Sequence, residues 1–307
     1  MTTTPQTTIV RNTVESRQAP PLAAWVEGLF GEGDAVHQVE RRCVRRRAGF
    51  ALVSVRVPDA VDLTASSLEN ETVVAYETIA DQLREDDWHP VRFWNHVPHI
   101  NEPMGDGRDR YMTFNAGRFR AFVNWYGSAH EFDRLVATAS GIGHRGRDLV
   151  VHCLAMQQPG KAVDNPRQVA PYHYSRRFGP LPPAFARATV LKAADDLPGR
   201  ILVGGTASVR GEDSVHVADL SQQLDETFEN LAALVRAADG HMNGERPSRS
   251  SLLARYRDLR AYVPDESNFD AVASAISAAF PSLQRLELLR AELCRSELLV
   301  EIEGVAN

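Results

Sequence analysis

Apolar and polar residues recur along this chain in patterns that predict strands and helices in turn. The segment 50–60 alternates as a half-buried strand does, and the unbroken apolar run 148–156 indicates a buried strand. Apolar residues at helical spacing predict a helix over 69–85. By the same criteria we expect further strands at 91–100, 188–193, 200–209 and 283–293, and further helices at 113–126, 222–239 and 267–281. Strands and helices that alternate in this way are typical of the α/β class.

The order strand, helix, strand occurs at both ends of the chain, which indicates two similar modules. Residues 1–20 are rich in Thr, Gln and Pro and show no periodicity, so we expect a disordered or loosely attached arm. We expect an N-terminal α/β module over 21–147. A C-terminal module over 148–307 would then carry the last strand.

The last predicted strand, ELLVEIEG at 297–304, carries two carboxylates on one side. Leu298, Val300 and Ile302 share one face of this strand, and Glu301 and Glu303 lie on the other. One interpretation is that this second face is exposed to water. The other is that one carboxylate faces a pocket and transfers protons. Since charged residues are mostly exposed, the alternation by itself favours water.

Composition and charge limit the classes of function. The 307 residues are 43% hydrophobic and 24% charged, which is ordinary for a globular protein with an apolar core. A net charge of −6, spread along the chain, argues against non-specific nucleic-acid binding. No apolar run approaches the ~20 residues of a membrane span, and MTTTPQTTIV lacks the features of a signal peptide. We expect no nucleic-acid or membrane partner.

Cysteine and histidine spacing does not indicate a metal site. Cys43, Cys153 and Cys294 are odd in number and far apart, which fits a reducing cytoplasm, and we expect a cytoplasmic protein. His96 and His99 flank a proline and therefore do not share a helix face. Rossmann, P-loop and nucleophile-elbow motifs are also absent from the sequence.

Two segments are dense in Arg, Tyr and Asn. In 108–127, aromatic residues alternate with Arg and Asn at helical spacing, which suits a pocket for a small anionic ring. The alternative is a core helix with arginines that extend to solvent. The segment 165–188 is a long, Pro-rich loop with Tyr172, Tyr174, Arg176 and Arg177. It is either a functional loop or a surface loop that wraps the fold.

Four sequence blocks, in this order, resemble the chorismatase family: RYMTFNAGRFRAF, RQVAPYHYSRRFGP, GGTASVRGEDSVH and LCRSELLVEIEG. Chorismatases remove pyruvate from chorismate, and the resemblance covers roughly residues 45–305. Their fold elaborates that of the small Rid (YjgF-like) proteins. The resemblance therefore implies two Rid/YjgF-like modules, with mixed β-sheets and helices packed on one face.

The resemblance also implies roles for individual residues. By position, Glu301 is the acid that protonates the enol-ether methylene of chorismate, and Cys294 steers the product. The expected anchors of the substrate carboxylates are Arg110, Arg118 and Arg295. Expected hydrogen-bond partners are Tyr111, Asn115, Tyr172 and Tyr174, and the expected wall residues are Thr206, Ala207 and Ser208. No cofactor is implied, because protonation of carbon and cleavage of an enol ether need neither metal nor redox chemistry.

Markers of the product within the resemblance disagree. Cys294 matches the members that form 3-hydroxybenzoate, whereas Ala207 matches the hydrolases that form a dihydroxy-cyclohexadiene carboxylate. We give Cys294 more weight, because a thiol can take part in opening and aromatising a ring-derived intermediate. At position 207 the members that form 3-hydroxybenzoate tend to have Gly, from which Ala207 differs by only one methyl group. Glu212 stands where the family pattern has His, which puts the pocket edge in question.

We therefore predict a chorismatase that acts on chorismate and forms 3-hydroxybenzoate. Four alternatives stay open: hydrolysis to the diol, 4-hydroxybenzoate as a co-product, a Rid-type imine or enamine hydrolase, and a non-catalytic protein that binds an aromatic acid. Rid proteins are trimers, but duplicated modules also satisfy such interfaces within one chain. The expected state is a monomer or a trimer.

Overall fold

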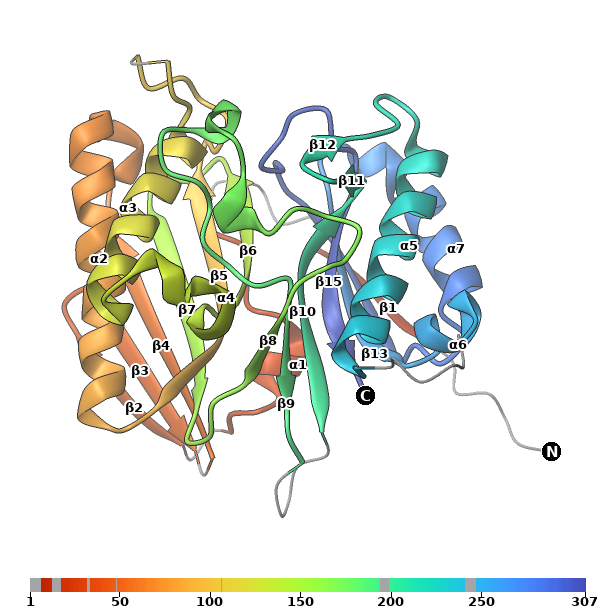
Figure 1. The fold of residues 1–307 in the computed structure, drawn as a ribbon, viewed down its shortest axis with the longest axis horizontal. Coiled ribbons are helices and arrows are strands. Elements are labelled where there is room, and N and C mark those ends of the chain that lie inside the picture. Colours follow the sequence, from red (N-terminus) through yellow and green to blue (C-terminus); the bar gives the residue numbers. More distant parts are fainter. Residues whose placement is uncertain are drawn as a thin grey trace.

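The computed structural model describes residues 7–12, 18–31, 34–47, 49–105, 107–193, 199–240 and 247–307. Within these residues the chain forms two mixed β-sheets that face each other, with helices on the two outer sides (Figure 1). The α/β class, with mixed sheets and helices packed on one face of each, is confirmed. None of the helices described is long and apolar enough to cross a membrane.

The first sheet has the order β2-β3-β4-β7-β5-β6. Its strands are β2 (Ala35–Val39), β3 (Arg42–Arg47), β4 (Phe50–Val57), β5 (His89–Pro98), β6 (Thr138–His144) and β7 (Leu149–Met156). Its outer face is covered by α2 (Ala65–Glu85) and α3 (Arg110–Tyr126) (Figure 1). Tyr76 of α2 lies among the rings of Phe93, Phe114 and Phe122, which joins both helices to the sheet.

The second sheet has the order β1-β14-β13-β15-β10-β9-β8. Its strands are β1 (Thr8–Asn12), β8 (Lys161–Val163), β9 (Ala188–Leu191), β10 (Arg200–Ala207), β13 (Tyr256–Val263), β14 (Arg285–Arg290) and β15 (Glu301–Ala306). Its outer face is covered by α5 (Leu220–Ala238), α6 (Arg249–Leu253) and α7 (Phe269–Ala279) (Figure 1). Short elements complete the fold: α1 (Ala24–Glu27), α4 (Phe132–Leu135), β11 (Val209–Arg210) and β12 (Asp213–Ser214).

The inner faces of the two sheets pack against each other. Apolar residues of both sheets, including Leu52, Trp94 and Leu202, form one buried cluster there together with Val26 of α1. The same layer holds buried ion pairs, of which Arg92–Glu303 joins the first sheet to the second. A layer that contains both apolar and charged contacts fixes the two modules in one relative position.

The structure differs from three of our expectations about boundaries. Residues 8–12 form β1, which pairs in parallel with β14, although we expected them in a loose arm. The other parts of that expected arm, residues 1–6 and 13–17, lie outside the described residues. Residues 149–156 pair with β4 and β5 of the first sheet, although we expected them in the C-terminal module that begins at 148. The last strand begins at 301 and not at 297, because 294–297 form a bend and a turn.

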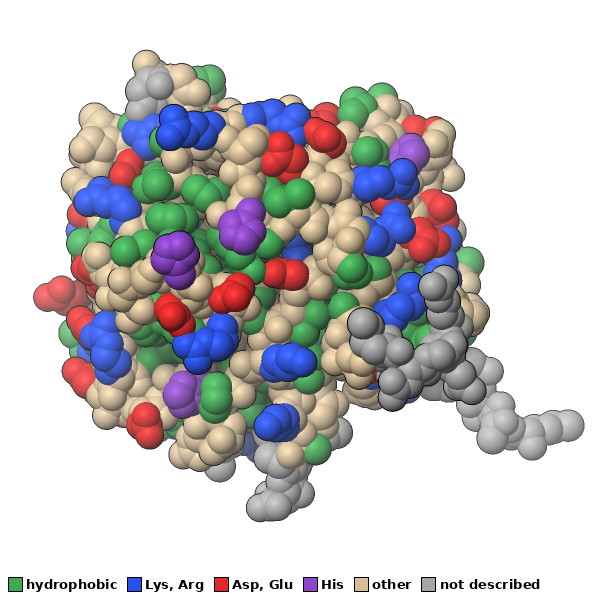
Figure 2. Space-filling view, in the orientation of Figure 1, with side chains coloured by type: hydrophobic (Ala, Val, Ile, Leu, Met, Phe, Trp, Pro, Cys, Tyr) green, Lys and Arg blue, Asp and Glu red, His purple; other side chains and the backbone are tan. Residues whose placement is uncertain are grey.

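Surface charge follows the composition. On the face shown in Figure 2, basic and acidic side chains are intermixed, as expected for a moderate net charge spread along the chain. Many of the exposed arginines lie in ion pairs, such as Arg147 with Asp59 at 2.7 Å.

Candidate active site

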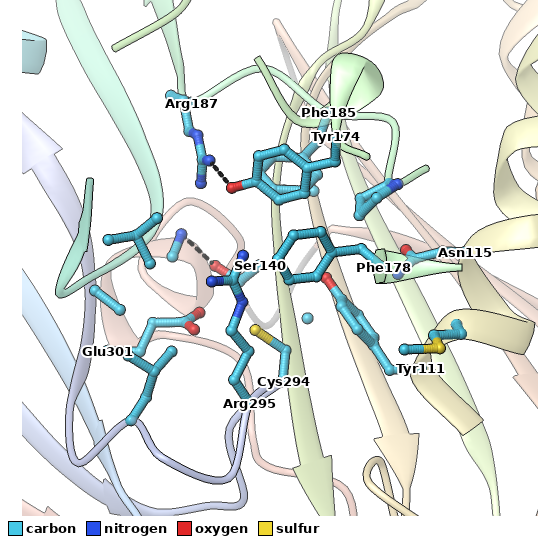
Figure 3. Close-up of a pocket in the computed structure, with 18 of the residues that line it drawn as sticks. Tyr111, Asn115, Ser140, Tyr174, Phe178, Phe185, Arg187, Cys294, Arg295 and Glu301 are labelled. Atoms are coloured by element: carbon cyan, nitrogen blue, oxygen red, sulfur yellow. Dashed lines mark hydrogen bonds between the residues drawn. The ribbon is translucent and has the colours of Figure 1, made fainter. Parts of the chain in front are cut away.

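A cavity lies between the two modules and takes its walls from both (Figure 3). Helix α3 and strand β6 line it from the first module, and strands β10 and β15 line it from the second. The segment 174–187 crosses it with aromatic side chains. The empty space between these walls, open solvent at the mouth included, is about 710 Å³.

Glu301, the first residue of β15, faces this cavity and is 5% exposed. Among the residues that the structure describes, its carboxyl group makes no hydrogen bond and no ion pair. Burial, with the nearby charge of Glu303, raises the pKa of Glu301 to about 8, and the more weakly acting charges of Arg187, Arg92 and Arg295 oppose this shift. At neutral pH the group is therefore mostly a neutral acid that is free to give its proton to a ligand.

Gly205 of β10 makes room for this carboxyl group. A Cβ atom at this position would lie 2.7 Å from Cδ of Glu301 and closer still to Oε1. A larger residue would therefore push the acid out of its place. The backbone N–H of Gly205 donates to Oγ of Ser140 at 2.9 Å, which fixes β10 against β6 at this point.

Two guanidinium groups line the same cavity (Figure 3). Arg187 is buried and donates to the hydroxyl of Tyr174 at 2.5 Å, while its Nε has no partner among the described residues. Arg295 donates to the carbonyl of Glu212 at 2.9 Å and lies 4.3 Å from the ring centroid of Phe178. Guanidinium groups that line a cavity are usual partners of anionic ligands.

The wall from α3 adds neutral polar groups. The side chain of Asn115 accepts a hydrogen bond from Arg118 at 2.7 Å, and its buried Nδ2 has no partner among the described residues. The ring of Tyr111 packs against β6, where a Cβ on Gly141 would lie 2.8 Å from it. Asp109 caps α3 by accepting from the N–H of Met112 at 2.7 Å, so the helix presents these groups from its first turns.

Cys294, which precedes β15 in the chain, also lines the cavity and is half-buried. Burial and the charge of Glu301 raise the pKa of its thiol to about 12. Near neutral pH it is therefore a thiol and not a thiolate, so it acts through its shape and its weak S–H donor and not as an anionic nucleophile.

Seven of the twelve residues expected at the site line this cavity: Tyr111, Asn115, Tyr174, Ala207, Cys294, Arg295 and Glu301. The other five, Arg110, Arg118, Tyr172, Thr206 and Ser208, do not line it. Glu301 and Ala207 lie opposite each other in the register of β15 and β10. Because side chains alternate along a strand, Thr206 and Ser208 on either side of Ala207 face away from the cavity.

The five residues outside the cavity are held by other groups. Arg110 donates to the carbonyls of Ala60 and Val61 at 3.0 and 3.2 Å, and to Glu102 at 2.7 Å. Arg118 lies behind Asn115, between aromatic rings. The hydroxyl groups of the others donate to groups outside the cavity: Tyr172 to Asp164 at 2.6 Å, Thr206 to Gly204 at 2.9 Å and Ser208 to Val215 at 2.9 Å.

Several residues of the cavity were not expected there, among them Ser140, Phe178, Phe185 and Arg187. Three of these belong to 165–188, whose density of Arg and aromatic residues was the available signal. Ser140 gave no signal, because we did not recognise β6 as a strand. Glu303, on the strand face for which the alternation favoured exposure to water, is 2% exposed and is a structural residue within the sheet interface.

Comparisons with known proteins place the chain beside one family. The family model described as "Chorismatase FkbO/Hyg5-like, N-terminal" matches residues 30–155. A protein named 3-hydroxybenzoate synthase from Streptomyces hygroscopicus is 37% identical over 238 residues, 76% of this chain and 68% of that protein. A protein named chorismatase from Streptomyces rapamycinicus is 33% identical over 219 residues, 70% of this chain and 63% of that protein. The chain thus spans about two thirds of the length of these relatives.

A solved structure supports the same assignment over more of the chain. A crystal structure of a chorismatase covers 89% of this chain and 79% of its own, with 26% identity and a TM-score of 0.76. The similarity in sequence and the similarity in fold therefore name the same family. This chain belongs to the chorismatase family.

Proposed function

We propose that the protein cleaves chorismate and releases pyruvate, with Glu301 as the general acid. The observation that carries this proposal is the buried carboxyl group of Glu301, which has no partner among the described residues and faces a cavity that also holds two guanidinium groups. Burial raises its pKa to about 8. Cleavage of an enol ether begins with a proton on carbon, and a neutral carboxylic acid near pH 7 is suited to that step.

The chemical step balances without a cofactor. Glu301 gives its proton to the methylene carbon of the enol ether, which forms an oxocarbenium ion next to the new carboxylate. Water adds to the cationic carbon, and the hemiketal breaks its bond to the ring oxygen, which gives pyruvate and a ring diol. Glu301 recovers a proton from the added water. Loss of one water from the diol then forms 3-hydroxybenzoate, so that no water is consumed overall.

We propose Arg187 and Arg295 as the cations that hold the carboxylates of the substrate. Arg295 was expected from the sequence, and Arg187 takes the place that Arg110 and Arg118 were expected to fill. The free Nδ2 of Asn115 and the hydroxyl of Tyr111 are the proposed polar partners on the other wall. A dianionic substrate also offsets the cost of keeping two arginines in a cavity.

Cys294 is the proposed determinant of the product. Its neutral thiol lies in the same wall as Glu301, where it limits the space around the ring and favours the loss of water that makes the ring aromatic. Ala207 lines the cavity as well and supports the second candidate, a hydrolase that releases the diol. 4-Hydroxybenzoate as a co-product is a third outcome of the same cleavage.

Incubation of the purified protein with chorismate tests the proposal. We expect pyruvate, measured with lactate dehydrogenase, and 3-hydroxybenzoate, identified by chromatography against authentic standards. Pyruvate together with the diol or with 4-hydroxybenzoate would support the proposed cleavage of chorismate but overturn 3-hydroxybenzoate as the product. No pyruvate would overturn the cleavage. Hydrolysis of an enamine substrate, or binding of 3-hydroxybenzoate without turnover, would then identify the Rid-type hydrolase or the binding protein.

Two substitutions separate the proposed roles. Glu301→Gln keeps the size of the side chain but removes its proton, and should lower the rate of pyruvate release by ~10²-fold or more. Cys294→Ala should change the ratio of 3-hydroxybenzoate to diol more than the rate. Near-wild-type pyruvate release by the first variant would exclude Glu301 as the acid, and an unchanged product ratio in the second would remove Cys294 from the proposal.

A further inference from the structure

Glu303 lies two residues after Glu301 on the same face of β15, yet its environment is the opposite one. Its Oε1 accepts from the indole N–H of Trp94 at 3.0 Å, and its Oε2 accepts from Arg92 at 2.7 Å. Ser140 also donates to Oε2, at 2.5 Å. A carboxyl group that accepts from donors at both oxygens, one of them a guanidinium group, is ionised.

The hydrogen bonds of Ser140 determine which groups in this network donate and which accept. Its Oγ accepts from Arg92 at 2.6 Å and from the backbone N–H of Gly205 at 2.9 Å, which uses both lone pairs. Its single proton is therefore directed at Glu303. Although Ser140 lines the cavity, it has no proton left to give to Glu301 or to a ligand.

The same network reaches the acid through Gly205. Gly205 donates to Ser140 on one side, and the space of its missing side chain is taken by the carboxyl group of Glu301 on the other. Glu301 and Glu303 thus lie on one face of β15, with the fixed charge on Glu303 and the free carboxyl group on Glu301. A fixed carboxylate beside a second, unpaired carboxyl group disfavours ionisation of the second.

Other charged and titratable groups act on the two carboxyl groups from every adjoining element. Arg92 of β5, and Arg260 and Tyr262 of β13, lie around Glu303. Around Glu301 the cavity adds Arg187, Arg295, Cys294 and Tyr111. The cations favour ionisation of Glu301, so burial and Glu303 are the influences that oppose them.

We propose that Glu303 is a positioning residue: its carboxylate, held ionised by Arg92, Trp94 and Ser140, keeps Glu301 protonated at the pH of catalysis. This inference rests on the proposed function of Glu301. It assigns no contact with the substrate to Glu303, which is enclosed by its three donors. This role is separate from the structural one of joining the sheets. Loss of the charge should shift the pH dependence of kcat, whereas loss of packing should lower kcat at every pH.

The test is the pH dependence of kcat for pyruvate release in the wild type and in Glu303→Gln. In the wild type kcat should fall as the pH rises through about 8, where Glu301 loses its proton. In Glu303→Gln this alkaline limb should move to lower pH by about one unit, and kcat well below the limb should stay within about threefold of the wild type. A uniform loss of kcat with the limb in its original place would overturn the proposal and leave Glu303 a structural role only.

Glu287→Gln is the matched control. Glu287 is also buried, lies on β14 of the same sheet and pairs with Arg260, but it does not line the cavity. Its loss should leave the alkaline limb where it is. A limb that moves equally in both variants would show a general effect of buried charge and would overturn the specific role of Glu303.

Two further measurements keep the outcome decisive. If Glu303→Gln does not fold, the double variant Arg92→Met/Glu303→Gln removes both members of the ion pair and leaves no unpaired buried charge. The alkaline limb of its kcat profile should still lie at lower pH than in the wild type, because Glu303 outweighs Arg92 in its effect on Glu301.

Carboxyl ¹³C resonances of Glu-labelled protein, assigned by Glu301→Gln, report the titration of Glu301 without turnover. A Glu301 titration that Glu303→Gln does not move overturns the inference even where no chorismate is cleaved, whereas absence of cleavage by the wild type overturns only the proposed function.

Discussion

At the scale of single residues, the central feature is a buried acid with no partner of its own. Glu301 has neither a hydrogen bond nor an ion pair among the residues described, although it is nearly inaccessible to solvent. Burial of a carboxyl group without a partner costs stability, and the cost is reduced when the group stays protonated. A group in this condition is typical of a functional site and not of a structural one.

The cost of burying the carboxyl group of Glu301 should appear as a gain in the free energy of unfolding of Glu301→Gln over the wild type, and this gain should depend on pH. Burial raises the pKa of Glu301 to about 8 in the folded protein, so between its unfolded value and about 8 the folded state holds more protons than the unfolded state. Wild-type stability must therefore fall as pH rises through this window, and that of Glu301→Gln must fall less. We expect the difference in free energy of unfolding to grow by about 3 kcal/mol between about pH 5 and pH 8 in urea titrations.

The control for this experiment is Glu85→Gln, which removes an exposed carboxylate at the end of α2. Because exposed substitutions seldom change stability by more than about 0.5 kcal/mol, its free energy of unfolding should stay close to that of the wild type at each pH. A constant difference for Glu301→Gln as well would mean that Glu301 titrates alike in the folded and unfolded states.

A second prediction at this scale concerns Gly205. Gly205→Ala would place a methyl group 2.7 Å from Cδ of Glu301 and displace the acid. Since a displacement of about 1 Å costs on the order of 10²-fold in rate, pyruvate release should fall by about that factor. Steady-state assays at a fixed pH measure the effect.

Gly199→Ala, immediately before the same strand, is the matched control. The nearest atoms to its new Cβ would lie at 3.4 and 3.5 Å, which is ordinary contact, so activity should stay near wild type. If Gly205→Ala were as active as this control, close approach of β10 to the acid would not matter for catalysis.

At the scale of elements, the segment 165–187 is held over the cavity by the hairpin of β11 and β12. Glu212, between these strands, accepts from the backbone N–H of Ser175 at 2.8 Å, and its carbonyl accepts from Arg295 at 2.9 Å. The resemblance led us to expect His at the position of Glu212. Its carboxylate fixes the backbone next to Tyr174 and Phe178, which form part of the wall.

We expect Glu212→Ala to weaken substrate binding more than the chemical step. Loss of the acceptor for Ser175 frees the segment that carries the aromatic wall, so KM for chorismate should rise by about fivefold while kcat stays within about twofold. Steady-state kinetics separate the two constants.

Asp213→Ala provides the comparison for this variant. Asp213 contacts the same segment through an exposed ion pair with Arg177 at 2.5 Å, and exposed pairs contribute little. Its KM should stay near the wild-type value. If both variants had the same KM as the wild type, the hairpin would not control the wall of the cavity.

At the scale of the whole molecule, the two modules are joined across the interface of their sheets. Arg260 and Glu287 of the second sheet hold the chain that leads into α1: Arg260 donates to the carbonyls of Pro21 and Leu22 at 2.6 and 2.8 Å, and Glu287 accepts from the N–H of Ala24 at 2.8 Å. Helix α1 in turn packs its Val26 between the sheets. The site therefore depends on both modules being folded together.

We expect Glu287→Gln to destabilise the protein by about 3 kcal/mol, because it leaves the buried guanidinium group of Arg260 without its counter-ion. Urea unfolding followed by tryptophan fluorescence and by circular dichroism should give coincident single transitions at lower urea than the wild type. Separate transitions for the two probes would mean that the modules unfold independently. A loss below about 0.5 kcal/mol would mean that this ion pair does not hold the molecule together.

Much of the local structure could be predicted, because it depends on nearby residues. The helix expected at 69–85 is α2 (Ala65–Glu85), and the strand expected at 91–100 is β5 (His89–Pro98). Each of these elements buries one face, and the spacing of apolar residues along the chain predicts that face. The strand β6 was missed, since its run TASGIGH has small residues where Gly141 and Gly143 allow side chains of other elements to approach.

The sequence by itself determined the α/β class, and it placed Glu301 and Glu303 together on one face of the last strand. Only the tertiary structure decided their different roles, because neighbours across a sheet interface leave no trace in local periodicity. Arg92 and Ser140 come from strands of the first sheet and donate hydrogen bonds to the carboxylate of Glu303, whereas Gly205 gives Glu301 only space. An ionised structural carboxylate and a neutral acid thus arise from identical side chains two positions apart.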